Sequence, residues 1–330
     1  MRKTSAMVEA GILSAIAIVM ALIAMYVPVI GAFVNFVWPL PIIICGMRNG
    51  LKYSIMTLIV ATIIIAIIIS PIQAFFLGAI FGLLGLILGE CMRRRLPPMK
   101  LMLFGSIGAV IALVLNIVLS FAVLDIDPIA MMFKSFEESL TTMGDFYRSH
   151  GVSEEDTKAA VASYAEMIKM MRVIMPGAFL LSAPMLAFVN YFVAKKVMQR
   201  LGESFEDLPP FRLWVFPTWI LAPFFASLVG VTYFYVNKMT DTWMYGACVN
   251  VQTVCTFCLV LQAVCILYWY VDSKNKPKWW AGVGTTLVFT VPIISQIMVY
   301  VGAMDMVVDF RKIRKDYGNL PKENSKSKKK

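Results

Sequence analysis

The stretch that decides the fold is MVEAGILSAIAIVMALIAMY, residues 7–26. It is almost entirely apolar, and its length of about 20 residues is what a helix needs to cross the hydrocarbon core of a bilayer. Small residues recur along it at steps of four, three, four and three: Ala10, Ser14, Ala17, Ala21 and Ala24. At about 100° per residue they share one face. The stretch therefore predicts a membrane-spanning helix with one nearly flat side.

The whole chain has the composition of a membrane protein. Its 330 residues are 59% hydrophobic and 15% charged, with a mean hydropathy of +0.76. A soluble domain of this size needs far more polar surface. We predict spans at 7–27, 33–47, 51–70, 74–91, 101–124, 174–197, 214–236, 244–271 and 280–304. The expected fold is an all-α, polytopic helix bundle of eight or nine spans.

Basic loops give the expected orientation. They follow zero, two, four and six spans, so the positive-inside rule predicts a cytoplasmic N-terminus in the cell membrane and an extracellular segment 125–173. Residues 311–330 carry nine basic and two acidic side chains, which also predicts a cytoplasmic location. Nine full spans would place this tail outside, so we expect 280–304 to be a re-entrant hairpin bent at Pro292. The tail itself, 313–330, has a disordered composition.

Segment 125–173 has five basic and nine acidic residues and a helical pattern. One apolar face is predicted from Phe133, Phe136, Leu140, Met143 and Tyr147. Ser153 and Asp156 have the spacing of a capping box, which predicts a second helix. We expect an extramembrane helical hairpin over the outer end of the bundle, either as a functional lid or as a solvated structural loop. The predicted domains are a six-helix bundle at 1–200 that contains this hairpin, and further membrane helices at 201–312.

Polar side chains within the spans are costly and face the bundle interior. Gln73, Asn116 and Asn190, with Tyr164 on the second hairpin helix, are the candidate substrate-binding residues. The alternative is that the amides only make hydrogen bonds between helices.

Motifs for catalysis are missing from the sequence. It contains no G-x-x-x-x-G-K-[ST] phosphate loop, no H-E-x-x-H and no G-x-S-x-G, and its single histidine is His150. The Cys255–Cys258 pair has no second ligand pair of the kind that zinc sites need. We therefore expect no enzyme activity, no metal, no cofactor and no nucleic-acid partner; an intramembrane enzyme is the weakest hypothesis.

The flat face of residues 7–26 has a physical use. In lipid, small residues let two helix backbones approach closely and gain dispersion contacts. Ala6, Ala10, Ser14 and Ala17 form this docking strip, and the docked helix belongs either to this chain or to a partner protein.

Several stretches resemble the YybS-like family of bacterial membrane proteins of unassigned function. They are TSAMVEAGILSAIA, PLPIIICGMRNGLKYS, GAIFGLLGLILGECMRRR, LPPFRLWVFP and GAMDMVVDFRK, between about residues 4 and 312. The first six spans are also similar to S components of energy-coupling-factor transporters. That resemblance implies a six-helix bundle that binds a vitamin near its outer face. It also implies that Ala6, Ala10, Ser14 and Ala17 dock a membrane coupling subunit that works with ATPases.

Two functions follow as expectations. The first is a transporter-like subunit that binds a small polar or amphipathic metabolite under the 125–173 hairpin and depends on a partner for energy. The second is a scaffold without transport that docks other membrane proteins through its first helix.

Overall fold

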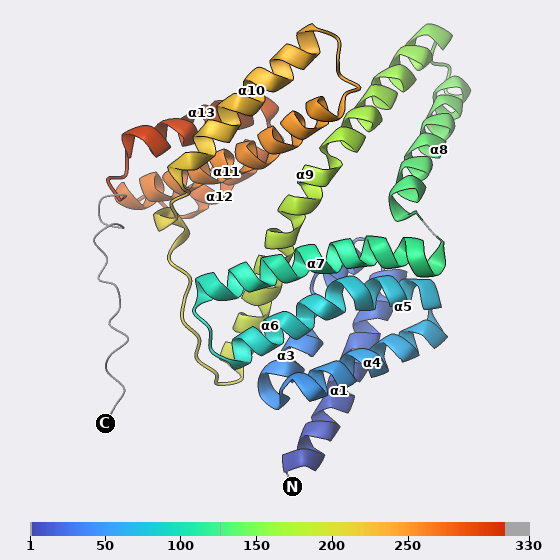
Figure 1. The fold of residues 1–330 in the computed structure, drawn as a ribbon, viewed down its shortest axis with the longest axis vertical. Coiled ribbons are helices and arrows are strands. Elements are labelled where there is room, and N and C mark those ends of the chain that lie inside the picture. The colour runs from blue at the N-terminus through green and yellow to red at the C-terminus, as the bar shows by residue number, and fades with distance from the viewer. Residues whose placement is uncertain (1, 126, 314–330) are drawn as a thin grey trace. The chain divides into compact units, whose positions relative to one another are not determined.

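A computed structural model of the chain describes residues 2–125 and 127–313, and every regular element in these ranges is helical. The chain divides into two compact units, Met1–Asp207 and Leu208–Lys330. Figure 1 shows the order of the helices. The predicted domain boundary at residue 200 lies seven residues before this division. Apart from Ile313, the predicted tail 313–330 lies outside the described residues.

Unit 1 begins with the helices predicted from the apolar runs. The bounds are α1 Arg2–Tyr26, α2 Ile30–Phe36, α3 Leu40–Asn49, α4 Leu51–Ile68, α5 Pro71–Leu77, the π-helical turn η1 Gly78–Gly82, α6 Leu83–Arg93 and α7 Pro98–Leu124. The second predicted span is broken between α2 and α3, next to Pro39, because proline lacks the N–H that a helix interior needs. The fourth runs from α5 through η1 into α6.

The small-residue face of α1 packs inside unit 1. Ala10 and Ala17 are fully buried, and the Ser14 hydroxyl donates to the carbonyl oxygens of Ala10 and Thr57 at 2.8 and 3.3 Å. The indole N–H of Trp38 donates to the carbonyl oxygen of Ala17 at 2.9 Å. Helix α4, the turn that contains Trp38 and the following helix α3 pack on α1.

The segment after α7 is a helical hairpin, as predicted. It consists of α8, Pro128–Ser149, and α9, Glu154–Arg200. The Ser153 hydroxyl accepts a hydrogen bond from the Asp156 backbone N–H at 3.1 Å, so this predicted N-terminal cap is confirmed. All five apolar residues predicted for the inner face of α8 are buried or half-buried, including Phe133.

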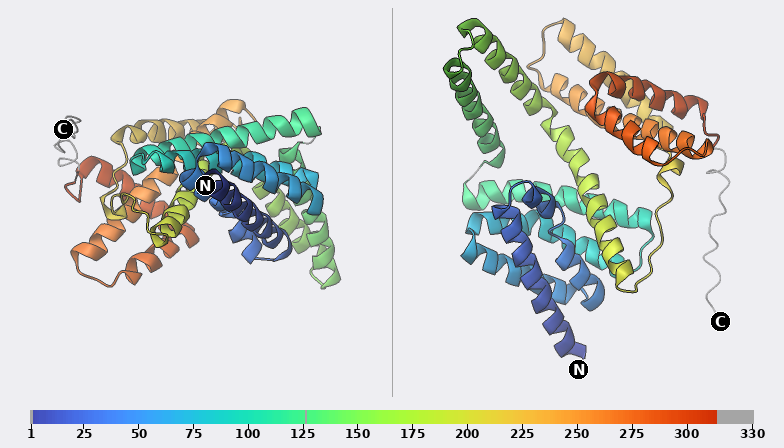
Figure 2. Two further views of the ribbon diagram at one scale, coloured as in Figure 1. Left: turned by 90° about the horizontal axis from the view of Figure 1, so that it is seen from below. Right: turned by 180° about the vertical axis from the view of Figure 1, so that it is seen from behind.

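The hairpin differs from the prediction in two respects. α9 is one helix of 47 residues, about 70 Å long at 1.5 Å per residue, and it contains Pro176 and Pro184. The predicted division between the hairpin at 125–173 and the sixth span at 174–197 is therefore wrong. The hairpin also extends away from α1–α7 instead of covering them, with α8 running back beside the N-terminal half of α9 (Figure 2).

Unit 2 contains the remaining membrane helices. Its elements are η2 Phe211–Leu213, η3 Thr218–Ile220, α10 Leu221–Val236, α11 Trp243–Ser273, α12 Trp279–Thr290 and α13 Pro292–Val308. The last two are bent against each other by 109°, and Pro292 begins α13. This confirms the predicted break, because Val291 adopts an extended conformation before the proline.

The described residues include eight helices long and apolar enough to cross a membrane, or nine if the bent pair is one span. The predicted all-α polytopic membrane fold is confirmed.

Within unit 2, α11 and α13 meet at a very close approach. A Cβ atom on Gly302 would lie 2.0 Å from the Leu259 carbonyl oxygen, so only glycine fits at this position. Around this contact lies an apolar core that includes Leu259, Val288 and Met306.

Candidate functional site

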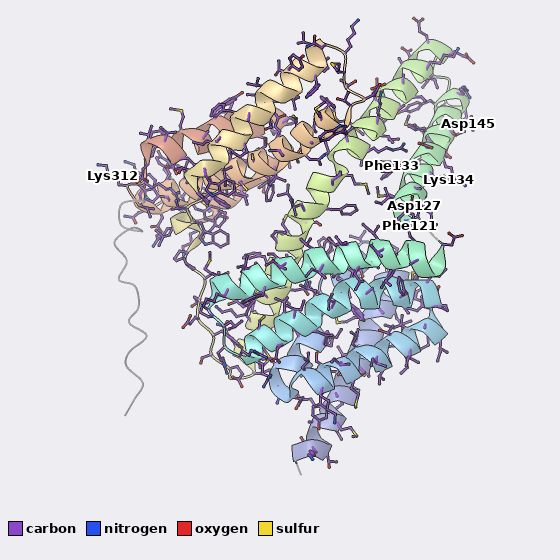
Figure 3. The ribbon with its side chains drawn as sticks, viewed as in Figure 1. Phe121, Asp127, Phe133, Lys134, Asp145 and Lys312 are labelled. Atoms are coloured by element: carbon purple, nitrogen blue, oxygen red, sulfur yellow. The ribbon has the colours of Figure 1, made fainter. Side chains whose placement is uncertain are left out.

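A polar hollow of about 610 Å³ lies at the root of the hairpin, where α7 ends and α8 begins. We call it the hairpin-root hollow. The residues that line it are Asp125, Asp127, Ala130, Met131, Lys134, Glu137 and Arg172. Figure 3 shows Asp127, Phe133 and Lys134 near the start of α8, beside Phe121 of α7.

The connection between α7 and α8 places two carboxylates at this hollow. Asp125 ends α7 in the left-handed conformation, with φ of 50°. The Asp127 carboxylate caps α8 and accepts hydrogen bonds from the backbone N–H groups of Ile129 and Ala130, both at 2.9 Å. An acidic side chain is favoured at a helix N-terminus because it meets the positive end of the helix dipole.

Helix α9 supplies the opposite wall through Arg172. Its guanidinium lies 3.2 Å from the Glu137 carboxylate and 4.6 Å from the centre of the buried Phe133 ring. The ring and the carboxylate together hold the cation at the junction of α8 and α9. The hollow thus combines three carboxylates with two cations, Lys134 and Arg172.

None of the four predicted substrate-binding residues lines this hollow. Gln73 is exposed on α5, and Tyr164 is 43% exposed on α9. Tyr164 and Asn190 are 26 residues apart on one continuous helix, which is about 39 Å. They cannot touch the same small ligand.

The two asparagines also lie apart. α7 and α9 meet where Gly105 faces Ala187, next to Asn190. Asn116 lies 11 residues further along α7, or about 16 Å. The Asn190 amide donates to the carbonyl oxygens of Phe36 and Leu186, both at 2.9 Å. The bond to Phe36 joins α9 to α2. Asn190 therefore makes the hydrogen bond between helices that was the alternative to substrate binding.

The predicted partner-docking strip is corrected by the packing of α1. Ala6, Ala10, Ser14 and Ala17 are all buried within unit 1, so they offer no surface to another protein. Of the two alternatives that the sequence left open, the docked helices belong to this chain.

The sequence contained one indication of the hairpin-root hollow, the excess of acidic side chains in 125–173. This excess did not locate the hollow itself, because its position depends on how α8 and α9 bring Glu137 and Arg172 together. Residues 35 positions apart gave no spacing pattern to detect.

A second polar cluster lies buried in unit 2, and the ion pair at its centre was not predicted from the sequence. Asp305 and Arg311 form an ion pair with 3.1 Å between Nη2 and Oδ2, and their side chains are 0% and 1% exposed. The Gln262 amide donates to the same carboxylate at 2.5 Å, and its carbonyl oxygen accepts from the Phe216 backbone N–H at 3.0 Å.

Comparison with known proteins identifies the family but no function. The chain is 23% identical over 306 residues to the uncharacterised protein YybS of Bacillus subtilis (strain 168), covering 93% of this chain and 97% of YybS. No solved structure matches the chain, so the similarity to S components stays a prediction. A family model described as "Predicted membrane protein (DUF2232)" matches residues 15–306. Because that match covers most of the sequence, the chain belongs to the DUF2232 family of multi-pass membrane proteins.

Proposed function

We propose that this membrane protein is a solute-binding, transporter-like subunit of the cell membrane and that the hairpin-root hollow is where the solute binds. The observation that supports this proposal is a charged hollow of about 610 Å³ formed at one end of a membrane helix bundle. Its volume falls within the range of about 300–1,000 Å³ typical of small-molecule pockets.

The charges suggest the class of solute. Lys134 and Arg172 would bind a carboxylate or phosphate, and Asp125, Asp127 and Glu137 would bind an ammonium group. A small molecule that carries both charges, such as an amino acid or a short peptide, satisfies both sets. A purely apolar solute would form no ion pair or hydrogen bond with either set.

The energy for any transport would come from a partner protein. The sequence contains no phosphate loop for ATP, and we propose no enzyme activity for the chain itself. With the N-terminus in the cytoplasm, the hairpin would capture its solute outside the cell.

The test is solute binding by the full-length protein in detergent, measured as thermal stabilisation by amino acids, dipeptides, polyamines and dicarboxylates. We expect the molecules with both charges to stabilise the protein most. Replacing Lys134 and Arg172 with Gln should weaken that binding roughly tenfold or more, because each charge-assisted hydrogen bond contributes about 1.5–3 kcal/mol.

The hairpin provides a matched control. Glu154 and Lys158 form an exposed ion pair, 3.1 Å apart, near the distal end of the hairpin. The Glu154→Gln, Lys158→Gln double variant also alters two charged side chains of the hairpin, and we expect binding to be unchanged. Equal effects in both double variants, or no stabilisation by any of these solutes, would reject the proposal.

One observation favours a second function, a scaffold without transport. Met131, Met132, Met167, Met170 and Met171 are exposed on the hairpin. Methionine-rich surfaces adapt to many partners. A photoreactive residue at Met170 that crosslinks another protein in cells, with no solute binding in vitro, would favour the scaffold.

A further inference from the structure

Unit 2 contains a separate hollow of about 660 Å³ that the proposed function does not use. It is formed by residues 210–212, the C-terminal end of α11, the loop at 275–278 and the start of α12. We call it the basic hollow. Its lining combines cationic side chains with apolar ones.

The charge in the basic hollow is positive. Among its described lining residues, Arg212, Lys276 and Lys278 are cations and Asp272 is the one carboxylate. Asp272 already forms an ion pair with Arg212. An excess of two positive charges therefore faces the hollow, which favours an anion.

The apolar part of the lining consists of side chains that pack on one another and are partly or fully buried. The Phe211 and Tyr268 rings meet edge to face with centroids 5.4 Å apart, and Ala281 is buried at the base of α12. An anion that also carries hydrocarbon matches such a lining better than a free ion does.

Neighbouring residues indicate the depth of the basic hollow relative to the bilayer. It lies where α11, a helix of membrane-spanning length, ends at Ser273. Trp279 and Trp280 stack on each other next to Lys278 and are 58% and 50% exposed. Exposed tryptophans beside lysines are typical of the headgroup level of a membrane.

The wall of the basic hollow is held in place by the buried Arg311. Its guanidinium donates to the carbonyl oxygens of Arg212 and Trp214 at 2.7 and 3.0 Å. The N-terminus of α12, at Trp279, adds the positive end of a helix dipole to the same side.

We propose that the basic hollow binds a phosphate group at the membrane surface, specifically the headgroup of an anionic phospholipid. Lys276 and Lys278 contact the phosphate, Arg212 stays paired with Asp272, and the hydrocarbon next to the headgroup lies along Phe211 and Tyr268. Basic pockets at the ends of membrane helices bind anionic lipids by this combination of contacts.

The experiment uses the full-length protein in nanodiscs of phosphatidylcholine, with phosphatidylglycerol added as the probe. Native mass spectrometry measures how much phosphatidylglycerol is retained. Replacing Lys276 and Lys278 with Gln should lower the retention of phosphatidylglycerol roughly tenfold, because each lysine near the membrane surface strengthens binding to anionic lipid several-fold. Replacing both with Arg should preserve it.

Lys238 and Lys274 supply the matched control because neither lines the basic hollow. Replacing both with Gln removes the same charge, and we expect retention to change less than about twofold. An equal loss in the control would show general surface attraction and overturn the proposal. Retention that inorganic phosphate abolishes, with no preference for phosphatidylglycerol over phosphatidylcholine, would overturn the lipid as the source of the phosphate. A melting temperature equal to that of the wild type establishes that each variant folds.

Discussion

Arg311, which follows α13, places its guanidinium against the carboxylate of Asp305 inside unit 2, 3.1 Å away and out of contact with solvent. The same guanidinium binds two carbonyl oxygens of the segment that precedes η3. One side chain therefore holds the end of α13 to the segment that enters α10.

Replacing Arg311 alone should be severely destabilising. The Arg311→Met variant leaves the Asp305 carboxylate buried without its cation, at a cost of about 3–5 kcal/mol. Adding Asp305→Leu should recover part of this loss, because no buried charge then remains. Unfolding in sodium dodecyl sulfate, followed by circular dichroism, measures both variants. A single variant as stable as the wild type would contradict the buried pair.

A methyl group at residue 302 should separate two helices of unit 2. Gly302→Ala places its Cβ against the Leu259 carbonyl oxygen, and such overpacking costs about 1–3 kcal/mol. Gly282→Ala is the control, because a Cβ there meets nothing within 4 Å. Alanine is the better helix former, so this control should be neutral or stabilising by up to about 1 kcal/mol. Equal melting temperatures for the two variants would contradict the close approach.

A larger side chain on the flat face of α1 should lower the folding stability of unit 1. Ala10→Leu adds three carbons at a fully buried position opposite Thr57, and we expect a loss of about 1–3 kcal/mol. Val8→Leu, on the exposed face of the same helix, should have little effect. The thermal stability of purified protein measures this loss without any partner present. An Ala10→Leu protein of normal stability would restore the partner-docking interpretation.

The hairpin should open when its buried ring is removed. Phe133→Ala deletes a side chain that packs between α8 and Arg172, and such deletions cost about 3–5 kcal/mol in well-packed cores. Hydrogen exchange should become faster throughout 128–173. Phe146→Ala, at an exposed position of the same helix, should leave exchange nearly unchanged. Equal protection in the two variants would argue against a folded hairpin.

Hydropathy and helix signals predicted most of the fold because they act locally. Apolar runs of membrane length located the spans, and Pro292 and Ser153 marked a break and a helix start that the structure contains. The sixth span was expected to begin at residue 174, close to Pro176, but a proline can be accommodated within a helix, and only the tertiary contacts of α9 decide that the helix continues.

The sites depended on contacts that no local pattern contains. Asp305 lies within α13, but Arg311 lies beyond its end, where Asp309 adopts the left-handed conformation and turns the chain back toward Asp305. In the same way, Glu9 of α1 binds Arg48 of α3, 39 positions further along the chain, at 2.7 Å. Both pairs follow from how the chain turns back on itself.

Helix α9 has a mechanical consequence. No loop separates the half that packs on α8 from the half that packs on α3, α6 and α7. A displacement at the tip of the hairpin is therefore transmitted along one continuous helix to the helices that pack on its C-terminal half. Pro176 and Pro184 each lack the amide N–H that would donate a hydrogen bond within α9. Bending of the helix is therefore expected to concentrate at these two residues.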